Sequence, residues 1–308
     1  MRQDEGPARR RQAAVVANPA RAGGLRRLRG QCERAAAAAG WAPPRLLLTT
    51  PADPGAGATR EALRHGAELV VAVGGDGTVH SCTQALARTA VPLGIVPAGS
   101  ANLTARALRL PGRVEAALAV AFGGVSEPID LATADGIWFT AMAGIGLDAA
   151  VVGTTPDAAK RVAGWPAYAG AAASHLLRSP ATFTVRLDDG EPLTRQARCV
   201  TVGNSGALPG GFRIMPDARL DDGLLDVVIL APTGLLGWLD VGLRVAGHSR
   251  RDDRQLERYR ARRVCISADA ELPRQVDGEM VTSGRSLTVE VAPAALLVRV
   301  PTAGARAG

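Results

Sequence analysis

Lysine and aromatic residues are scarce in this chain of 308 residues. Lysine occurs once, at Lys160, and no GxxxxGK[ST] pattern surrounds it. Because a P-loop needs a lysine in that pattern to reach the phosphates of its nucleotide, P-loop chemistry is excluded. Aromatic residues make up 3% of the sequence and form no aromatic-interleaved basic patch, which argues against a nucleic-acid-binding surface.

Long apolar runs are also missing. No run approaches the ~18 residues that a membrane-spanning helix needs. The first residues, MRQDEGPARRRQ, lack the apolar core of a signal peptide. We therefore expect a cytoplasmic protein without a transmembrane segment, and peripheral binding to the inner face of the membrane stays open.

The cysteines show no metal-binding or disulfide pattern. None of the four has CxxC spacing, which favours buried free thiols in a reducing compartment over a zinc site or a disulfide framework. These residues are Cys32, Cys82, Cys199 and Cys265.

The residues that are abundant indicate a large core and anionic partners. Hydrophobic residues make up 47% of the chain, which is long enough for two domains or one large one. The formal net charge is +7, which suits nucleotide phosphates or acidic lipid headgroups.

The stretch 68–108 contains two units in which an apolar run ends in a glycine turn and a helical pattern follows. The run 69–73 ends in GGDGT (74–78), and the run 93–96 ends in PAGS (97–100). Glycines at the end of a parallel strand let backbone N–H groups approach a phosphate, and the N-terminus of the next helix favours the same anion.

Asp76 lies in the middle of the first turn. Its carboxylate would repel phosphates unless a hard cation such as Mg²⁺ lies between them. Thr78 and Ser100 could cap their helices or bind phosphate. The alternative interpretation is two glycine turns with an Asx cap, but their tandem arrangement favours a nucleotide site.

The GGDGT turn and the PxGSxNxxAR-like element at 97–106 together resemble the diacylglycerol kinase catalytic domain family, which includes bacterial lipid kinases and sphingosine kinases. Phosphofructokinases and NAD kinases share the GGDG turn more distantly. The resemblance extends from Ala13 to about Pro301 and implies a kinase that uses ATP and Mg²⁺.

The pattern before residue 129 alternates strands and helices, which predicts a doubly wound parallel α/β domain. We expect strands at 13–17 and 45–48 beside the two apolar runs, and helices at 25–39, 59–65 and 113–122. By resemblance, the strand ending at Asn18 and the threonine at Thr50 lie near the nucleotide.

The pattern after residue 129 changes to short β runs, which predicts a mostly antiparallel β-sandwich domain with a helical insert at 165–177. The expected strands lie at 138–143, 182–187, 198–203, 225–230, 263–268 and 286–291. We place the first domain at 12–128 and the second at 129–294. By resemblance to the family, the tail at 295–308 returns to the first domain.

Three motifs fall in the second domain. GIGLDA (144–149) matches a dinucleotide pattern, but its context is not βαβ and no acidic residue follows at the right distance, so we reject that interpretation. The stretch 203–226 ends in DDGLLD, an oxygen-rich turn of the kind that can hold a divalent ion. A solvated acidic turn without metal is the alternative.

The third motif is DGE at 277–279. Two carboxylates separated by a glycine would share a face if the backbone were extended, so that one could bind a cation and the other take a proton. An ordinary hairpin turn is the alternative. The segment 235–243, followed by arginines, is read either as a packed helix with a solvated arginine end or as a membrane-facing amphipathic element.

The resemblance assigns the remaining roles. The nucleotide-binding residues would be Asn18, Thr50, Gly74, Gly75, Gly77, Thr78, Gly99, Ser100 and Asn102. The catalytic residues would be Asp76, Asp277 and Glu279, with Glu279 as the base and Asp76 as its competitor. The metal-binding residues would be Asp76, Asp130 and Asp222, with the backbone carbonyls of Arg219 and Leu225.

This chain departs from the family pattern at three places. Leu103 stands where many bacterial members have Asp, His80-Ser81 where many have Asn-Glu, and Ser100 where threonine is more frequent. The first two departures remove acidic groups from the expected magnesium network.

The sequence therefore predicts an ATP-dependent lipid kinase whose two domains enclose a cleft. Its acceptor would be a lipid hydroxyl at the membrane surface, with diacylglycerol as the default and sphingoid bases, other lipid alcohols or a soluble polyol as alternatives. A NAD-kinase-like phosphotransferase and a kinase-like protein that binds without turnover are the other hypotheses. The oligomeric state stays open, with a homodimer among the candidates.

Overall fold

The computed structural model describes residues 10–146, 179–206, 213–247 and 249–302. The chain divides into two compact units. The first unit comprises the chain up to Pro128 together with the C-terminal segment from Leu296, and the second comprises Ile129–Ala295. The helical insert expected at 165–177 and the second half of the GIGLDA motif lie outside the described residues.

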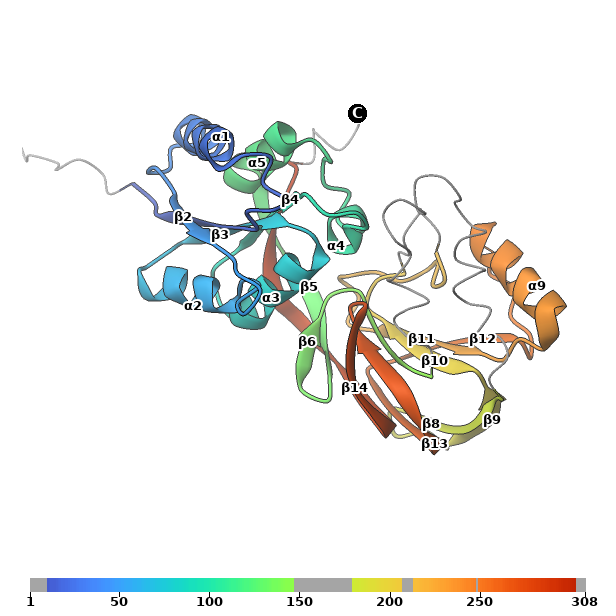
Figure 1. The fold of residues 1–308 in the computed structure, drawn as a ribbon. Helices are drawn as coiled ribbons and strands as arrows, with labels where there is room; N and C mark the ends of the chain where they lie inside the picture. Colours follow the sequence, from blue (N-terminus) through green and yellow to red (C-terminus); the bar gives the residue numbers. More distant parts are fainter. Residues whose placement is uncertain (1–9, 147–178, 207–212, 248, 303–308) are drawn as a thin grey trace, which may run out of the picture. The chain divides into compact units, whose positions relative to one another are not determined.

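The first unit is a parallel sheet covered by helices on both faces (Figure 1). Its strands lie in the order β4-β3-β1-β2, and all of these pairings are parallel. Their bounds are β1 Ala13–Ala17, β2 Arg45–Leu48, β3 Leu69–Gly74 and β4 Leu93–Pro97. β1 and β3 are buried along their whole length, as continuous apolar strands inside a doubly wound sheet must be.

The helices follow the strands in turn. Their bounds are α1 Leu25–Ala38, α2 Ala56–Arg64, α3 Asp76–Leu86, α4 Leu103–Ala107 and α5 Val114–Gly123. Figure 1 shows α1 and α5 on one face of the sheet and α2 and α3 on the other. The buried side chains of Leu28, Val71 and Phe122 belong to one core cluster under α1 and α5. The predicted doubly wound α/β fold is confirmed.

The second unit is built from antiparallel strands. The order β12-β11-β10-β7-β13-β14 forms its main sheet, and the β8–β9 hairpin pairs with β13. Its core gathers Phe139, Phe183 and Val264 among other buried apolar side chains. The strand bounds are β5 Val125–Ala134, β6 Ile137–Phe139, β7 Met142–Ile145, β8 Ala181–Leu187, β9 Leu193–Ala197, β10 Cys199–Gly203, β11 Leu225–Leu230, β12 Leu256–Ala261, β13 Arg263–Val276 and β14 Glu279–Val300.

The structure corrects several strand expectations. The single strand expected at 138–143 is two strands, β6 and β7, separated at Thr140-Ala141. β9 and β12 were not predicted, because their sequences, LTRQA and LERYRA, are largely polar. β13 and β14 are much longer than the runs predicted for them and form a bulged hairpin.

One helix of the second unit packs on the main sheet. α9 (Gly234–Ala246) covers the 235–243 segment, and its residues Val241 and Val245 join a cluster with Leu230 and Leu256. No helix in the described part of the chain is long and apolar enough to cross a membrane.

Candidate active site

The two glycine turns of the first unit lie against each other. They follow the neighbouring strands β3 and β4, and the Ala98 N–H donates to the Gly74 carbonyl over 2.8 Å. A Cβ atom added at Gly99 would lie 2.5 Å from the Cα of Gly75, a distance that real Cβ atoms do not adopt. Glycine at both positions therefore lets the two turns meet backbone to backbone at the carboxyl edge of the sheet.

Asp76 joins the starts of two helices. It is the first residue of α3, and its carboxylate accepts a hydrogen bond of 2.6 Å from the backbone N–H of Leu103, the first residue of α4. The acidic residue expected in the second loop by resemblance is thus replaced by a leucine whose backbone holds Asp76. One charge at this edge is well fixed in position.

The Asn102 side chain closes the second turn. Its Oδ1 accepts from the Gly99 N–H at 2.9 Å, and its Nδ2 donates to the Gly99 carbonyl at 2.8 Å. Asn102 has φ of 49°, the left-handed conformation that Asn tolerates better than most residues. Its contacts are those of a residue that shapes the turn.

Neither Thr78 nor Ser100 is the N-cap residue of its helix. Those residues are Gly75 for α3 and Asn102 for α4, and neither makes a capping hydrogen bond with its side chain. Thr78 is buried within the first turn of α3, and a Cβ at Gly74 would lie 2.5 Å from its Oγ1. Gly74 therefore gives Thr78 the room it occupies, and neither hydroxyl belongs to the N-cap residue of its helix.

Asn18 and Thr50 follow β1 and β2 at the same edge of the sheet. The Asn18 N–H donates to the Val73 carbonyl at 2.9 Å, and its Oδ1 accepts from the Ala20 N–H at 3.0 Å. Thr50 Oγ1 accepts from the Asp53 N–H at 3.0 Å. The parallel strands thus bring all the predicted nucleotide-binding positions to one edge, the usual ligand edge of such sheets.

Asp53 and Ser81 order the neighbouring helix start and were not assigned a role from sequence. Asp53 accepts hydrogen bonds of 2.8–3.1 Å from three backbone N–H groups at the start of α2, one of them from the N-cap residue Gly55. Burial raises the pKa of Asp53, but these N–H groups outweigh it and hold the pKa below its ordinary value. Ser81 Oγ accepts from the Ala56 N–H at 3.0 Å. An Asp just ahead of a helix is a capping signal that could have revealed the first of these contacts.

The DGE motif forms a tight turn. Asp277 and Gly278 have φ of 48° and 83° and connect Val276 to Glu279, which pair across the β13–β14 hairpin. The extended backbone that would place both carboxylates on one face is therefore not present, and the hairpin alternative is correct for this turn.

The two carboxylates of the DGE motif have different surroundings. Asp277 accepts hydrogen bonds from the backbone N–H groups of Thr140, Ala141 and Met142 at 2.8–3.1 Å, so it fixes the break between β6 and β7. Glu279 is exposed, and within the described residues its carboxylate makes no hydrogen bond. Glu279 therefore differs from Asp277 in being open to solvent.

Asp130 holds backbone rather than facing an open site. Its side chain is buried, with the residue 4% exposed. One oxygen accepts from the Gly223 N–H at 2.6 Å and the other from the Ala294 N–H at 2.8 Å. These contacts connect the DDG turn to the chain before Leu296.

An arginine faces the acidic DDGLLD turn. The Arg260 guanidinium lies 3.1 Å from Asp222 Oδ2 and 3.4 Å from Asp226 Oδ1. Burial raises the pKa of Asp226 above its ordinary value, and the charge of Arg260 opposes that rise. Arg219 pairs with Asp221 at 3.0 Å, and Leu225 lies in β11 opposite Ala261.

The residues around the two predicted Mg²⁺ positions, Asp76 and the DDGLLD turn, differ in how well they suit the ion. Among the described residues no cluster of three or more His, Cys, Asp or Glu side chains is arranged to hold a metal ion. Mg²⁺ in nucleotide sites needs only one or two carboxylates besides phosphate and water, which Asp76 satisfies. At the DDGLLD turn, Arg260 already supplies the positive charge, so the contacts favour the metal-free alternative there.

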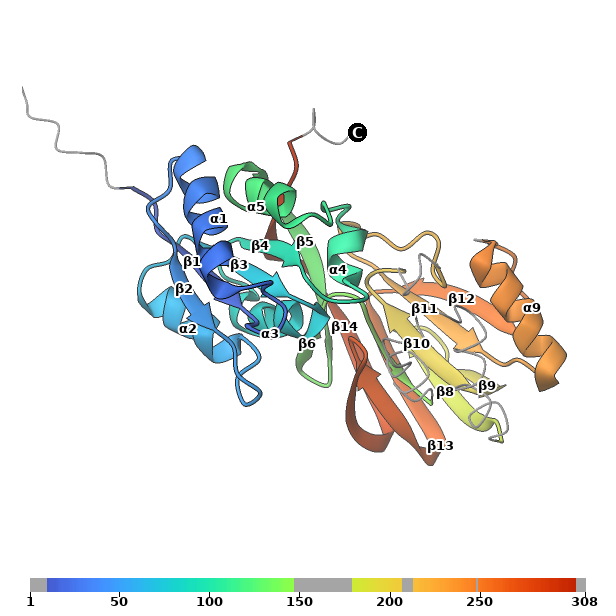
Figure 2. The same ribbon diagram turned by 45° about the horizontal axis from the view of Figure 1, so that its top comes forward.

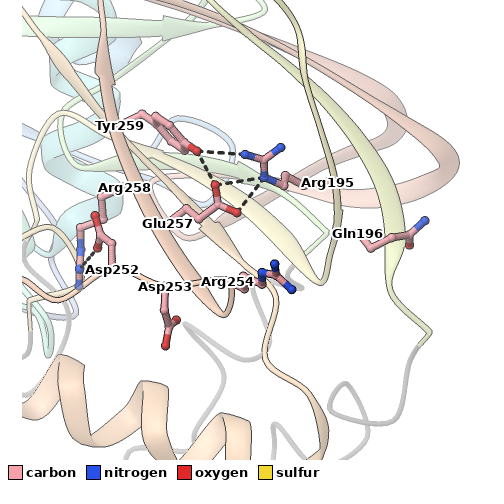
Figure 3. A pocket seen from close by; sticks show the side chains of 8 residues that line it. All are labelled: Arg195, Gln196, Asp252, Asp253, Arg254, Glu257, Arg258 and Tyr259. Carbon is pink, nitrogen blue, oxygen red and sulfur yellow. Dashed lines mark hydrogen bonds and ion pairs between the residues drawn. The ribbon is translucent and has the colours of Figure 1, made fainter.

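A cavity of about 660 Å³ in the second unit is separate from these residues (Figure 3). Glu257 pairs with Arg195 at 2.8 Å and accepts from the Tyr259 hydroxyl, while Asp252 pairs with Arg258 at 2.6 Å. Most of its charges are thus paired with each other. None of the predicted site residues lines it.

Two family models together match most of the chain. Residues 12–134 match the diacylglycerol kinase catalytic domain, and residues 141–300 match the YegS C-terminal NAD kinase beta sandwich-like domain.

Curated relatives show the same similarity. The chain is 35% identical over 251 residues to the "Probable lipid kinase YegS-like" of Pseudomonas aeruginosa (strain UCBPP-PA14), a match that covers 78% of this chain and 79% of the relative. It is 36% identical over 179 residues to a diacylglycerol kinase of Mycobacterium tuberculosis (strain CDC 1551 / Oshkosh), covering 54% and 56% of the two chains.

Solved structures share the fold. A diacylglycerol kinase from Bacillus anthracis str. Sterne superimposes with a TM-score of 0.73 at 22% identity, covering 96% of this chain and 99% of that one. An NAD kinase from Archaeoglobus fulgidus in complex with ATP gives a TM-score of 0.52 at 16% identity, covering 94% and 93%. The chain therefore belongs to the lipid kinase family that combines a diacylglycerol kinase catalytic domain with a YegS-type C-terminal domain.

Proposed function

We propose that this lipid kinase transfers the γ-phosphoryl group of ATP to a lipid hydroxyl, with diacylglycerol as the default acceptor and phosphatidic acid as the product. One observation carries the proposal: the two glycine turns meet backbone to backbone beside Asp76, whose carboxylate is fixed on the Leu103 N–H. Phosphoryl transfer depends mainly on positioning and on charge neutralisation, and this edge supplies both.

Residues of the first unit bind the phosphates, the nucleotide and the metal ion. The backbone of the turns at Gly74–Thr78 and Gly99–Asn102, with the N-terminus of α3, binds the phosphates. Asn18 and Thr50 lie at the same edge and line the nucleotide site. Mg²⁺, held by Asp76, would neutralise phosphate charge when bound.

Glu279 is the proposed base that takes the proton from the lipid hydroxyl. Its exposure and its lack of hydrogen bonds among the described residues support this choice over Asp277, whose oxygens accept several backbone N–H groups. Asp277 is then a positioning residue for the β6–β7 break, and Asp76 stays the competing base.

The test is turnover of labelled ATP by the full chain against a panel of acceptors in mixed micelles: diacylglycerol, sphingosine, other lipid alcohols and a soluble polyol. The panel is run for wild type, Asp76→Asn and the control Asp189→Asn. Asn keeps an oxygen for the Leu103 N–H and removes only the charge, whereas Ala would also release the start of α4. Asp189 is exposed and distant in sequence from every predicted site residue.

We expect diacylglycerol to be phosphorylated by wild type and by Asp189→Asn, and kcat to fall by about 10²-fold or more in Asp76→Asn. Near-normal turnover in Asp76→Asn would make Asp76 a turn residue only. ATP binding without phosphorylation of any acceptor by wild type would favour a kinase-like binding protein.

A further inference from the structure

The outer face of α9 is apolar and exposed. Leu236, Leu239 and Leu243 lie at spacings of three and four residues, which places them on one side of the helix. They are 80%, 50% and 65% exposed, the three highest values among the large hydrophobic side chains of the described residues. Figures 1 and 2 show α9 on the outside of the second unit, beyond β12.

The packing of the opposite face fixes this orientation. Val241 and Val245 pack into the cluster with Leu256 under the helix. Arg244, on the same inner side, donates to Asp253 over 2.7 Å and also pairs with Asp240. α9 is therefore a packed helix, as one sequence-based alternative holds, and its leucines face outward because the other side is occupied.

Positive charge without acidic partners follows the helix. Asp217, Asp252 and Asp253 pair with Arg250, Arg258 and Arg244, respectively. Arg251 and Arg254 are exposed, and in the part of the chain that the structure describes no carboxylate pairs with either. Arg254 also lines the cavity of the second unit (Figure 3). An apolar helix face followed in the chain by exposed arginines is a combination that binds the interface of a membrane with acidic lipids.

We propose that the outer face of α9 docks on the surface of an anionic lipid bilayer, with the three leucines in the acyl-chain boundary and Arg251 and Arg254 at the headgroups. The proposal stands on the contacts of α9 and goes beyond the proposed function, which only explains why docking on a bilayer would be useful.

A second copy of the chain fits this surface less well. A stable dimer interface typically buries about 800 Å² on each partner, or some 20–30 residues a side, whereas this patch is one strip of leucines. In a twofold dimer both copies would use the same patch, so the arginines of both would add like charge to one interface, and like charges repel.

The experiment is flotation of the full chain with vesicles of phosphatidylcholine alone or mixed with phosphatidylglycerol. The variant Leu236→Ser/Leu239→Ser/Leu243→Ser is compared with Leu25→Ser/Val125→Ser/Ile137→Ser, which removes three exposed apolar side chains elsewhere. The variant Arg251→Gln/Arg254→Gln is compared with Arg29→Gln/Arg64→Gln, which has the same net charge.

We expect wild type and both controls to bind the anionic vesicles. The α9 leucine variant should lose about 10²-fold or more in the partition coefficient, since each leucine contributes up to about tenfold. The arginine variant should lose about 25-fold at low salt, about fivefold for each charge, and less at high salt.

Three results would overturn the proposal. Wild type could fail to float, or a leucine variant with wild-type thermal unfolding could float as well as wild type. The leucine variant could also convert a dimer to a monomer and still float, which would make α9 an interface between copies. If the leucine variant does not fold, the comparison of Arg251→Gln/Arg254→Gln with its control tests the proposal instead. A folded arginine variant that floats as well as wild type at low salt would then overturn it.

Turnover in detergent micelles separates this proposal from the kinase proposal. The α9 variants should phosphorylate micellar lipid at the wild-type rate while losing vesicle binding. If no protein in the set phosphorylates lipid but the leucine variant still loses the vesicles, the kinase proposal fails and docking stands. If micellar turnover is normal and vesicle binding is unchanged, docking fails alone.

Discussion

Backbone N–H groups hold the carboxylates of Asp76, Asp130 and Asp277 in place. A carboxylate that accepts such bonds is fixed in position, and part of its capacity to accept further hydrogen bonds or to bind a metal ion is already used. Glu279 differs from these three aspartates, because its carboxylate makes no such bond among the described residues. This difference matters for function. Side chains of the same chemical type therefore serve as anchors or as reactive groups according to their neighbours.

Glu279→Gln tests the proposed base. The amide keeps the shape of the side chain and loses its basicity, so kcat should fall by about 10²–10⁴-fold while ATP affinity stays nearly unchanged. Steady-state turnover and equilibrium ATP binding measure the two quantities, with exposed Glu271→Gln as the control. Loss of ATP binding together with turnover would instead assign Glu279 to metal binding or structure and return the base to Asp76.

Gly99→Ala tests the contact between the two turns. The new Cβ would lie 2.5 Å from the Cα of Gly75, so one turn must move, at a cost of about 1–3 kcal/mol. We expect a lower melting temperature and a clear loss of ATP affinity by calorimetry. Gly112→Ala is the matched control, because nothing lies within 4 Å of its added Cβ. Equal ATP affinity in both variants would contradict the role given to the turn.

Sequence reasoning located these residues better than it described their contacts. Glycine turns after apolar runs could be placed from the sequence, because parallel strands bring their carboxyl ends to one edge. Residue types alone do not determine backbone geometry. The sequence therefore could not show that the Asn102 side chain binds the backbone of its own turn, or that Asp277 adopts a left-handed conformation.

At the scale of elements, the hairpins and turns of the second unit are stabilised by charge pairs on polar strands. β12 reads LERYRA, and its Arg260 faces the acidic turn next to β11 while Glu257 pairs with Arg195 of β9. Apolar patterning could not reveal β9 and β12, because pairing with their neighbours decides such polar strands. By contrast, a strand with an apolar inner face, such as β11, has the same bounds in the structure as in the prediction.

The DDGLLD turn provides the prediction at this scale. If Arg260 neutralises the turn, the melting temperature of the nucleotide-free protein should not respond to millimolar Mg²⁺, and Asp222→Asn should cost about 1 kcal/mol through its contacts to Arg260 and to the Leu224 N–H. Thermal unfolding with Mg²⁺ or with chelator measures both, and exposed Asp221→Asn is the control. A Mg²⁺-dependent rise in wild type that Asp222→Asn abolishes would identify a structural ion instead.

At the scale of the whole molecule, the first unit is completed by the far end of the sequence. β14 ends beside β4, where Val298 pairs with Leu93, and its residues Leu296, Val298 and Val300 are buried. The sheet predicted from the first part of the chain therefore includes a strand that enters only when nearly all of the chain has been made. Local patterning cannot predict such a pairing, because the two strands are about 200 residues apart. The return expected at 295–308 depended on the family resemblance, which did not specify the partner strand.

Arg299 fixes this last strand to α5. Its guanidinium donates to the carbonyls of Ala121 and Phe122 and to Ser126 Oγ, at 3.0–3.1 Å. Carbonyls at the end of a helix lack partners within the helix and favour a cation. Burial, with a contribution from Arg11, lowers the pKa of Arg299 from its ordinary value, but an arginine stays charged at neutral pH.

Arg299→Met should therefore destabilise the first unit specifically. It removes three hydrogen bonds and leaves carbonyls without that donor, at a cost of about 1–3 kcal/mol. Arg285→Met, an exposed arginine on the same strand but in the second unit, is the control. Hydrogen exchange should rise in α5, β4 and the end of β14 of Arg299→Met and stay unchanged in β10 and β11, because those strands belong to the second unit. If exchange rises equally in both units, the two units unfold together and the effect of Arg299 is not specific to the first. If exchange rises in neither unit, Val298 and its buried neighbours hold the strand without the arginine.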